Sequence, residues 1–147
     1  MYKLLVIFHL LGAAVWVGGH LVLAANVLPK ALAARDPQVL LGFEGGFEKL
    51  GMPALAIQIL TGFTLVHWWF PDLSAALAAH DPRLPWVGVK LALLLATAGL
   101  ALNARLRLIP HLTAATLPVL AWHVRAVTVF AVLFLVAGAA IRTGGLP

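Results

Sequence analysis

The sequence contains no cysteine, and this absence excludes several kinds of site at once. Without thiols the chain has no disulfide, no thiolate-bound zinc and no iron–sulfur cluster. Charged residues are also scarce, because Asp, Glu, Lys and Arg make up 10% of the 147 residues, whereas soluble domains contain about 25%. So few charges cannot cover the surface of a water-soluble protein, and most of this surface must therefore face an apolar medium.

Acidic residues are the scarcer of the two charge types, with 5 Asp and Glu against 10 Lys and Arg. In a soluble protein this basic excess would suggest a nucleic-acid partner. Here the basic residues lie mainly between apolar runs, where loop orientation and lipid head groups account for them. We therefore expect the lipid bilayer as the partner of this surface, and no nucleic acid.

Four long apolar runs account for most of the chain. A helix that crosses a bilayer needs about 20 mainly apolar residues, and irregular backbone cannot face lipid. The four runs cover residues 4–28, 52–70, 86–104 and 120–141. The sequence therefore predicts an all-α fold, a single domain over residues 1–147 that forms an integral membrane four-helix bundle. We expect a multi-pass protein of the cell inner (plasma) membrane.

The polar connections between the runs indicate how the bundle is oriented. Asp36-Pro37 is typical of a helix start, so the residues after it form either a short helix or the cytoplasmic lead of the second span. Basic residues are commoner in cytoplasmic connections. Five lie in the first and third connections and three lie on the other side: Lys30, Arg35, Lys49, Arg105 and Arg107 against Lys3, Arg83 and Arg142. This bias predicts that both termini lie on the outer side.

Ionisable residues inside the spans are candidates for function, because they are costly to place in lipid. A rise of about 1.5 Å per residue gives their depths and divides them into two levels. His9, His67 and Lys90 belong to the outer level, and His20, Asn103 and His123, with Arg125 close by, belong to the inner level. His9 and His20 are almost three helical turns apart, so they share one face of the first span with Trp16.

The histidines have three interpretations, of which the simplest is structural. A membrane histidine can hydrogen-bond a neighbouring helix, and Lys90 can extend to the outer head groups. The second interpretation is haem b, whose iron takes axial imidazoles, often from two helices, in an apolar slot. His9 with His67 would form an outer pair and His20 with His123 an inner pair, for one or two haems. Lys90 and Arg125 would then meet the haem propionates.

The third interpretation of the histidines is a copper site. Imidazole binds copper well, but a path for Cu(I) would favour the soft ligands Cys and Met. The chain has no Cys and two Met. A Cu(II) site made of His9 and His67, which His80 and Asp81 of the second connection would join, stays open.

Several short segments resemble one superfamily of membrane proteins. The sequence HLLGAAVWVGG at residues 9–19 resembles the opening helix of copper-resistance D (CopD) proteins. Residues 60–62 (LTG) resemble the second CopD segment, and residues 90–93 (KLAL), with 103–105 (NAR) and Pro110, resemble the third. The related HemJ-type protoporphyrinogen oxidases are similar in plan. The resemblance covers most of the chain and implies a four-helix membrane unit for copper handling or haem chemistry.

Two features of the chain differ from the patterns of these families. Larger CopD proteins have additional spans, whereas we expect four spans in this sequence. HemJ-type proteins share an early histidine and a lysine at the position of Lys90, but they usually have a histidine in the third span, where this chain has Asn103.

We expect a membrane haem-b-binding protein with a role in electron transfer or membrane redox chemistry. CopD-like copper uptake or resistance is the first alternative, and HemJ-like oxidation of protoporphyrinogen is the second. The sequence leaves open whether the chain is an enzyme, and an oxidoreductase would fit the first expectation. A quinone or a redox protein would be the electron partner, and a homodimer is compatible with so small a bundle.

Overall fold

The computed structural model describes residues 1–145, which form helices joined by short connections and include no strand. Four helical segments within these residues are long and apolar enough to cross a membrane. They are Tyr2–Ala34, Pro37–Trp69, Leu84–His111 and Leu117–Thr143. The predicted all-α fold with four helices of membrane-spanning length is therefore confirmed.

The first long segment continues past its predicted end at residue 28. It consists of α1 (Tyr2–Val22), a π-helical turn η1 (Leu23–Val27) and α2 (Leu28–Ala34). Pro29 does not end this segment: it follows the π-helical turn η1, in which the Leu28 N–H bonds the Leu23 carbonyl five residues earlier, and the helix continues through it to Ala34. The chain reverses only at Arg35, which has a left-handed φ of 53°.

The second long segment, α3 (Pro37–Trp69), is a single helix that includes most of the polar connection before the predicted span. The Asp36 side chain starts it by accepting a hydrogen bond from the backbone N–H of Gln38 at 2.9 Å. The alternative that a helical lead follows Pro37 is therefore confirmed. The 33 residues of α3 extend about 50 Å at 1.5 Å per residue. This length exceeds the roughly 30 Å of a bilayer hydrocarbon core.

The second half of the chain contains the other two long segments. The Asp72 side chain caps a short helix by accepting from the backbone N–H of Ala75 at 3.0 Å. The last helix ends at Gly144, whose φ of 80° suits glycine. The elements in chain order are α4 (Leu73–Ala78), α5 (Leu84–Asn103), a π-helical turn η2 (Ala104–Leu108), a 3-10 turn η3 (Ile109–His111) and α6 (Leu117–Thr143).

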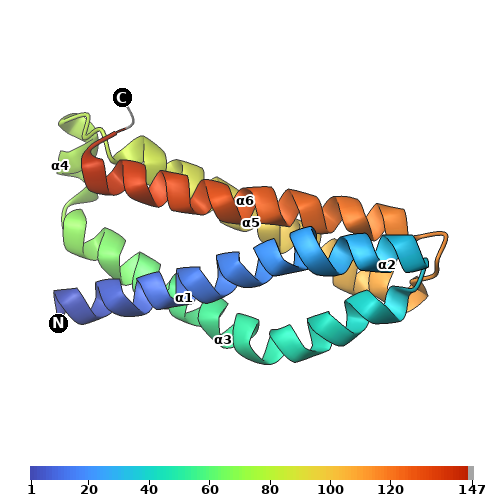
Figure 1. The fold of residues 1–147 in the computed structure, drawn as a ribbon. Helices are drawn as coiled ribbons and strands as arrows, with labels where there is room; N and C mark the ends of the chain where they lie inside the picture. The colour runs from blue at the N-terminus through green and yellow to red at the C-terminus, as the bar shows by residue number, and fades with distance from the viewer. Residues whose placement is uncertain (146–147) are drawn as a thin grey trace.

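The four long segments pack as two antiparallel pairs (Figure 1). α1 packs along α3, α5 packs along α6, and α1 also contacts α6, which joins the two pairs. The start of α1 and the end of α6 lie at the same end of the bundle. We call this the terminal end, where Tyr2 and Arg142 meet, and we call the opposite end, around Arg35 and His111, the loop end. Which end faces the cytoplasm stays a prediction.

Burial is deepest toward the loop end. The residues of the buried cluster there come from η1, α2, α3, η2 and α6, and they include Leu28, Ala31, Leu40, Leu117 and Ala121. Elsewhere large apolar side chains are exposed along every long segment, and Leu95 of α5, for example, is 74% exposed. Apolar surface on this scale is unfavourable in water and suits a lipid environment.

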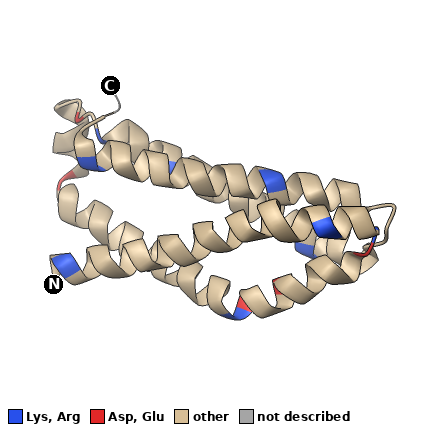
Figure 2. Cartoon of the chain, viewed as in Figure 1, with Lys and Arg blue, Asp and Glu red and all other residues tan. Residues whose placement is uncertain are grey.

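Charged residues lie at both ends of the bundle and also at a few places along its length (Figure 2). At the loop-end half, Arg105 of η2 and Glu48 of α3 form an ion pair at 2.6 Å. This pair is largely exposed, so it contributes little to stability. Lys90 lies in α5, and α6 contains Arg125 and, in its last turn, Arg142. The site described below includes Lys90.

Candidate functional site

His9 is held where α1 crosses α3. Its ring Nδ1 lies 2.8 Å from the Thr61 hydroxyl oxygen. The side-chain amide of Gln58 donates to the His9 backbone carbonyl. The ring packs against the same turn of α3, since a Cβ on Gly62 would lie 3.4 Å from His9 Cε1, an ordinary van der Waals contact. One turn of α3 therefore fixes both the backbone and the ring of His9.

The hydrogen bonds of Thr61 determine which nitrogen of His9 bears the proton. The Thr61 hydroxyl lies 2.5 Å from the carbonyl oxygen of Ile57 and donates its only hydrogen there. It must then accept from His9, so the neutral ring has its hydrogen on Nδ1. The lone pair of Nε2 is left free for a metal or a hydrogen-bond donor.

Lys90 of α5 lies at the level of His9. Its Nζ would be 3.6 Å from a Cβ placed on Gly138 of α6. Gly138 follows Thr128, which contacts the His20 carbonyl, by ten residues, and His9 precedes His20 by eleven, so the antiparallel helices bring Gly138 and His9 to about the same level. In residues 1–145 the two ion pairs are Arg83–Asp81 and Arg105–Glu48, so Lys90 has no acidic partner there. A half-buried unpaired cation beside a neutral imidazole favours an anionic group in a ligand.

His20, deeper along the same face of α1, is surrounded by aromatic rings. Its Nδ1 lies 2.8 Å from the Trp16 carbonyl oxygen, so Nδ1 again bears the hydrogen and Nε2 is free. The ring centroid is 4.5 Å from that of Trp16, and the ring meets Phe47 of α3 edge to face at 5.8 Å. The Thr128 hydroxyl of α6 lies 2.7 Å from the Val124 carbonyl oxygen of its own helix and 3.2 Å from the His20 carbonyl oxygen, so its single hydrogen is shared between the two and α1 contacts α6 here.

Phe47 occupies a notch made by two glycines. A Cβ on Gly19 of α1 would overlap the Phe47 ring, and a Cβ on Gly51 of α3 would approach it to 2.9 Å. Phe43 stacks on Phe47 with ring centroids 5.8 Å apart. The position of Phe47, and with it the edge contact to His20, therefore depends on the absence of two side chains.

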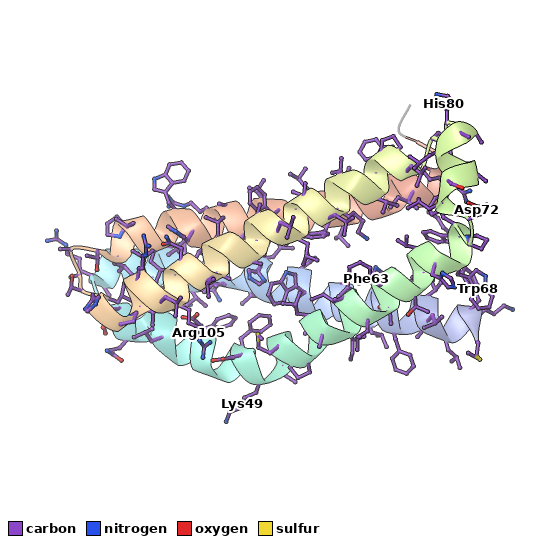
Figure 3. All side chains as sticks on the ribbon, turned by 180° about the vertical axis from the view of Figure 1, so that it is seen from behind. Lys49, Phe63, Trp68, Asp72, His80 and Arg105 are labelled. Atoms are coloured by element: carbon purple, nitrogen blue, oxygen red, sulfur yellow. The ribbon has the colours of Figure 1, made fainter. Side chains whose placement is uncertain are left out.

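His67 lies away from the level of His9. It follows Thr61 by six residues, which is about 9 Å along α3 with a rotation of about 120°. Tyr2 packs at this level, with its ring 5.8 Å from Trp68. His67 is exposed and shares a helical stripe with Phe63, which lies on the side of α3 toward α5 (Figure 3). The structure thus brings His9 to Thr61 and leaves His67 nearer the terminal end.

His123 and Arg125 of α6 are not brought to His20. His123 Nδ1 lies 3.1 Å from the Val119 carbonyl of its own helix. His123 precedes Thr128, which contacts α1, by five residues, and this spacing turns it about 140° away from that contact. Arg125 and Asn103 are exposed. The predicted roles of His123 and Arg125 in a second haem site stay predictions.

The connection between α3 and α5 contains the other residues of the copper interpretation. His80 is exposed in a turn, with a φ of 53°. Asp81 accepts from Arg83, whose Nη2 lies 2.6 Å from Asp81 Oδ2, and the hydrogen bonds from this guanidinium lower the pKa of Asp81 to about 2. Across residues 1–145 no three His, Asp or Glu side chains gather in an arrangement that could hold a metal ion.

The residues around His9 and His20 include three polar side chains that the sequence prediction did not select: Gln58, Thr61 and Thr128. A signal for the first two was present. Small or polar residues recur every three or four positions along α3, at Gly51, Ala54, Gln58 and Thr61. Such a stripe in an apolar helix is typical of a close helix–helix contact.

The fold and site thus define a four-helix bundle of membrane-spanning length with an imidazole and an unpaired lysine at one level. The chain matches no protein-family model, no curated protein and no solved structure. The resemblance to CopD and HemJ-type proteins therefore rests on the short segments of the sequence alone.

Proposed function

We propose that this chain is a multi-pass membrane protein that binds haem b through His9 and takes part in electron transfer or membrane redox chemistry. The observation behind the proposal is the pairing of His9, whose free nitrogen is Nε2, with the unpaired cation Lys90 at the same level of the bundle. Haem b needs an axial imidazole in apolar surroundings and a cation for its propionates. When bound, haem supplies a one-electron iron couple.

The side chains around His9 suit such a group. Thr61 holds the imidazole in one orientation with its hydrogen on Nδ1, as the partners of ligating histidines generally do. Thr97 of α5 is 5% exposed, and its hydroxyl has no hydrogen-bond partner among the described residues. It follows Lys90 by seven residues, on the same face and about 10 Å deeper. A buried unsatisfied hydroxyl is a group that a ligand or an ordered water would satisfy.

His67 is the candidate for a second axial ligand, and His20 with His123 are the candidates for a second haem. His67 lies on the stripe of α3 that faces α5, and it is exposed rather than packed. His9, by contrast, is positioned before any ligand arrives. We therefore assign the principal role to His9. The spin state of the haem iron will show whether His67 is the second axial ligand.

The test is the optical spectrum of protein expressed with ample haem and purified in a mild detergent. We expect a red protein with a narrow α-band on reduction, and we expect His9→Ala to lose the band. His67→Ala should convert the spectrum to a high-spin form if His67 is the second ligand. His80→Ala is the matched control, because His80 is exposed in a turn outside the bundle. A colourless wild-type protein would refute the proposal.

Copper analysis separates the main alternative from this proposal. If the colourless protein bound copper stoichiometrically and His80→Ala weakened that binding, the CopD-like function would replace haem binding. A spectrum that is intact in His80→Ala and lost in His9→Ala would favour haem.

A further inference from the structure

A pocket opens at the terminal end of the bundle, between α1, the end of α3, the start of α5 and the end of α6. It has a volume of about 360 Å³, and its lining includes Tyr2, Trp69, Arg83, Arg142 and Thr143. No Asp or Glu belongs to the lining. The sequence prediction assigned none of these residues to a site, and the proposed haem site does not use them.

The Tyr2 hydroxyl is the central polar group of this pocket. Trp69 Nε1 donates to it at 3.2 Å, and Arg142 Nη1 donates to it at 3.1 Å. The hydroxyl accepts both bonds, so its own hydrogen is still free to be donated. Arg142 uses one of its five N–H groups in this contact, and the others are available to a ligand.

The two arginines of the pocket differ in charge balance. Arg83 is neutralised by Asp81, which hydrogen-bonds both its Nε and its Nη2. Because those bonds lower the pKa of Asp81 to about 2, the pair stays ionised at physiological pH. Arg142 has no acidic partner in residues 1–145. The pocket therefore has one net positive charge, which matches a phospholipid whose phosphodiester charge is not cancelled by a cationic head group.

The position of the pocket indicates where such a phosphate comes from. Tyr2, Trp68 and Trp69 gather at the terminal end of the bundle. Tyr and Trp concentrate where a membrane protein meets the head groups. A pocket with one unpaired arginine in this belt lies at the depth of lipid phosphates.

We propose that this pocket binds the phosphate of an anionic phospholipid through Arg142 and the Tyr2 hydroxyl. The proposal rests on the membrane embedding of the four helices and does not depend on haem. Arginine supplies two parallel hydrogen-bond donors to a phosphate, and Tyr2 supplies a third. Binding here therefore depends on directed hydrogen bonds and not only on the attraction of an anion to a basic surface.

The test compares lipid binding by the intact protein and three variants, by native mass spectrometry in detergent with phosphatidylglycerol or phosphatidylcholine. We expect the wild type to retain one phosphatidylglycerol and little phosphatidylcholine. Arg142→Gln should weaken this binding about tenfold or more, as expected for the loss of hydrogen bonds to a charged group. Tyr2→Phe, which removes one hydroxyl, should have a smaller effect in the same direction. Lys3→Gln is the control, because Lys3 is a cation near Tyr2 that does not line the pocket.

Three outcomes would overturn the assignment: no change in Arg142→Gln and Tyr2→Phe, an equal loss in Lys3→Gln, or displacement of the lipid by millimolar inorganic phosphate. Circular dichroism and size exclusion verify that each variant is folded. If Arg142→Gln does not fold, Tyr2→Phe still tests the proposal. The optical spectrum of each variant is recorded as well. An unchanged haem band with lost lipid binding, or the reverse, separates a failure of one proposal from a failure of the other.

Discussion

Replacing Thr61 by Val removes the hydroxyl that orients His9 while it keeps the shape of the side chain. The His9 ring then loses the acceptor for its Nδ1 hydrogen. A hydrogen bond of this kind contributes about 1 kcal/mol, which is close to a fivefold preference for the Nδ1–H form. Mutation of the group that hydrogen-bonds the second ring nitrogen of a ligating histidine typically lowers the affinity for the metal by about 10- to 100-fold. We therefore expect Thr61→Val to weaken haem binding by about tenfold.

The assay is a haem titration of the purified apoprotein, followed in the Soret region. Thr64→Val is the matched control, because Thr64 lies three residues away on the same helix, is exposed, and bonds only the Leu60 carbonyl at 2.8 Å. We expect Thr64→Val to titrate like the wild type. If the two variants titrate identically, the hydroxyl of Thr61 does not orient a haem ligand, and His9 loses its special place in the proposal.

Three further predictions concern the packing, the charge and the orientation of the bundle. Gly19→Ala should destabilise the protein by about 1–3 kcal/mol in a denaturant titration, because its Cβ would overlap Phe47. Gly18→Ala is the control and should be neutral, because its Cβ would meet nothing within 4 Å. Equal stabilities of the two variants would contradict the packing of Phe47 against Gly19. Lys90→Met should lower haem content, and Lys90→Arg should lower it less; equal content in all three proteins would indicate that Lys90 only extends to head groups. A reporter fused to the C-terminus should be active on the outer side, and activity only in the cytoplasm would reverse the predicted orientation.

The four long helices were predictable from the sequence because each apolar run is about as long as a membrane-spanning helix and longer than the apolar stretch of a typical buried helix in a soluble protein. Their ends were less predictable. The segment after Asp36 contains Glu44, Glu48 and Lys49 and lacks the composition of a span, yet it is helical. The Asp36 cap and the proline after it begin the helix well before the apolar residues do. Composition marks lipid contact, whereas caps mark where the helix starts.

Part of the candidate site was also predictable, since His9 and Lys90 are ionisable residues inside apolar runs. The pairing of His9 with His67 at one depth was inferred from span centres, and α3 begins 15 residues before its predicted span, at residue 37 rather than 52. The stagger of α1 against α3 depends on side-chain fit instead. A Cβ on Gly12 would lie 3.0 Å from the Ala54 carbonyl, so this close approach fixes the register, and single-chain periodicity contains no such information.

The three histidines that bond through Nδ1 are not equivalent, and the difference singles out His9. His20 bonds the carbonyl of Trp16 and His123 bonds that of Val119, each four residues earlier in the same helix. Any helical histidine can satisfy itself in this way, so these two bonds need no function. The partner of His9 is 52 residues away on another helix. That bond forms only in the assembled bundle, so the fold itself determines the orientation of the His9 ring, which is what a ligand site requires.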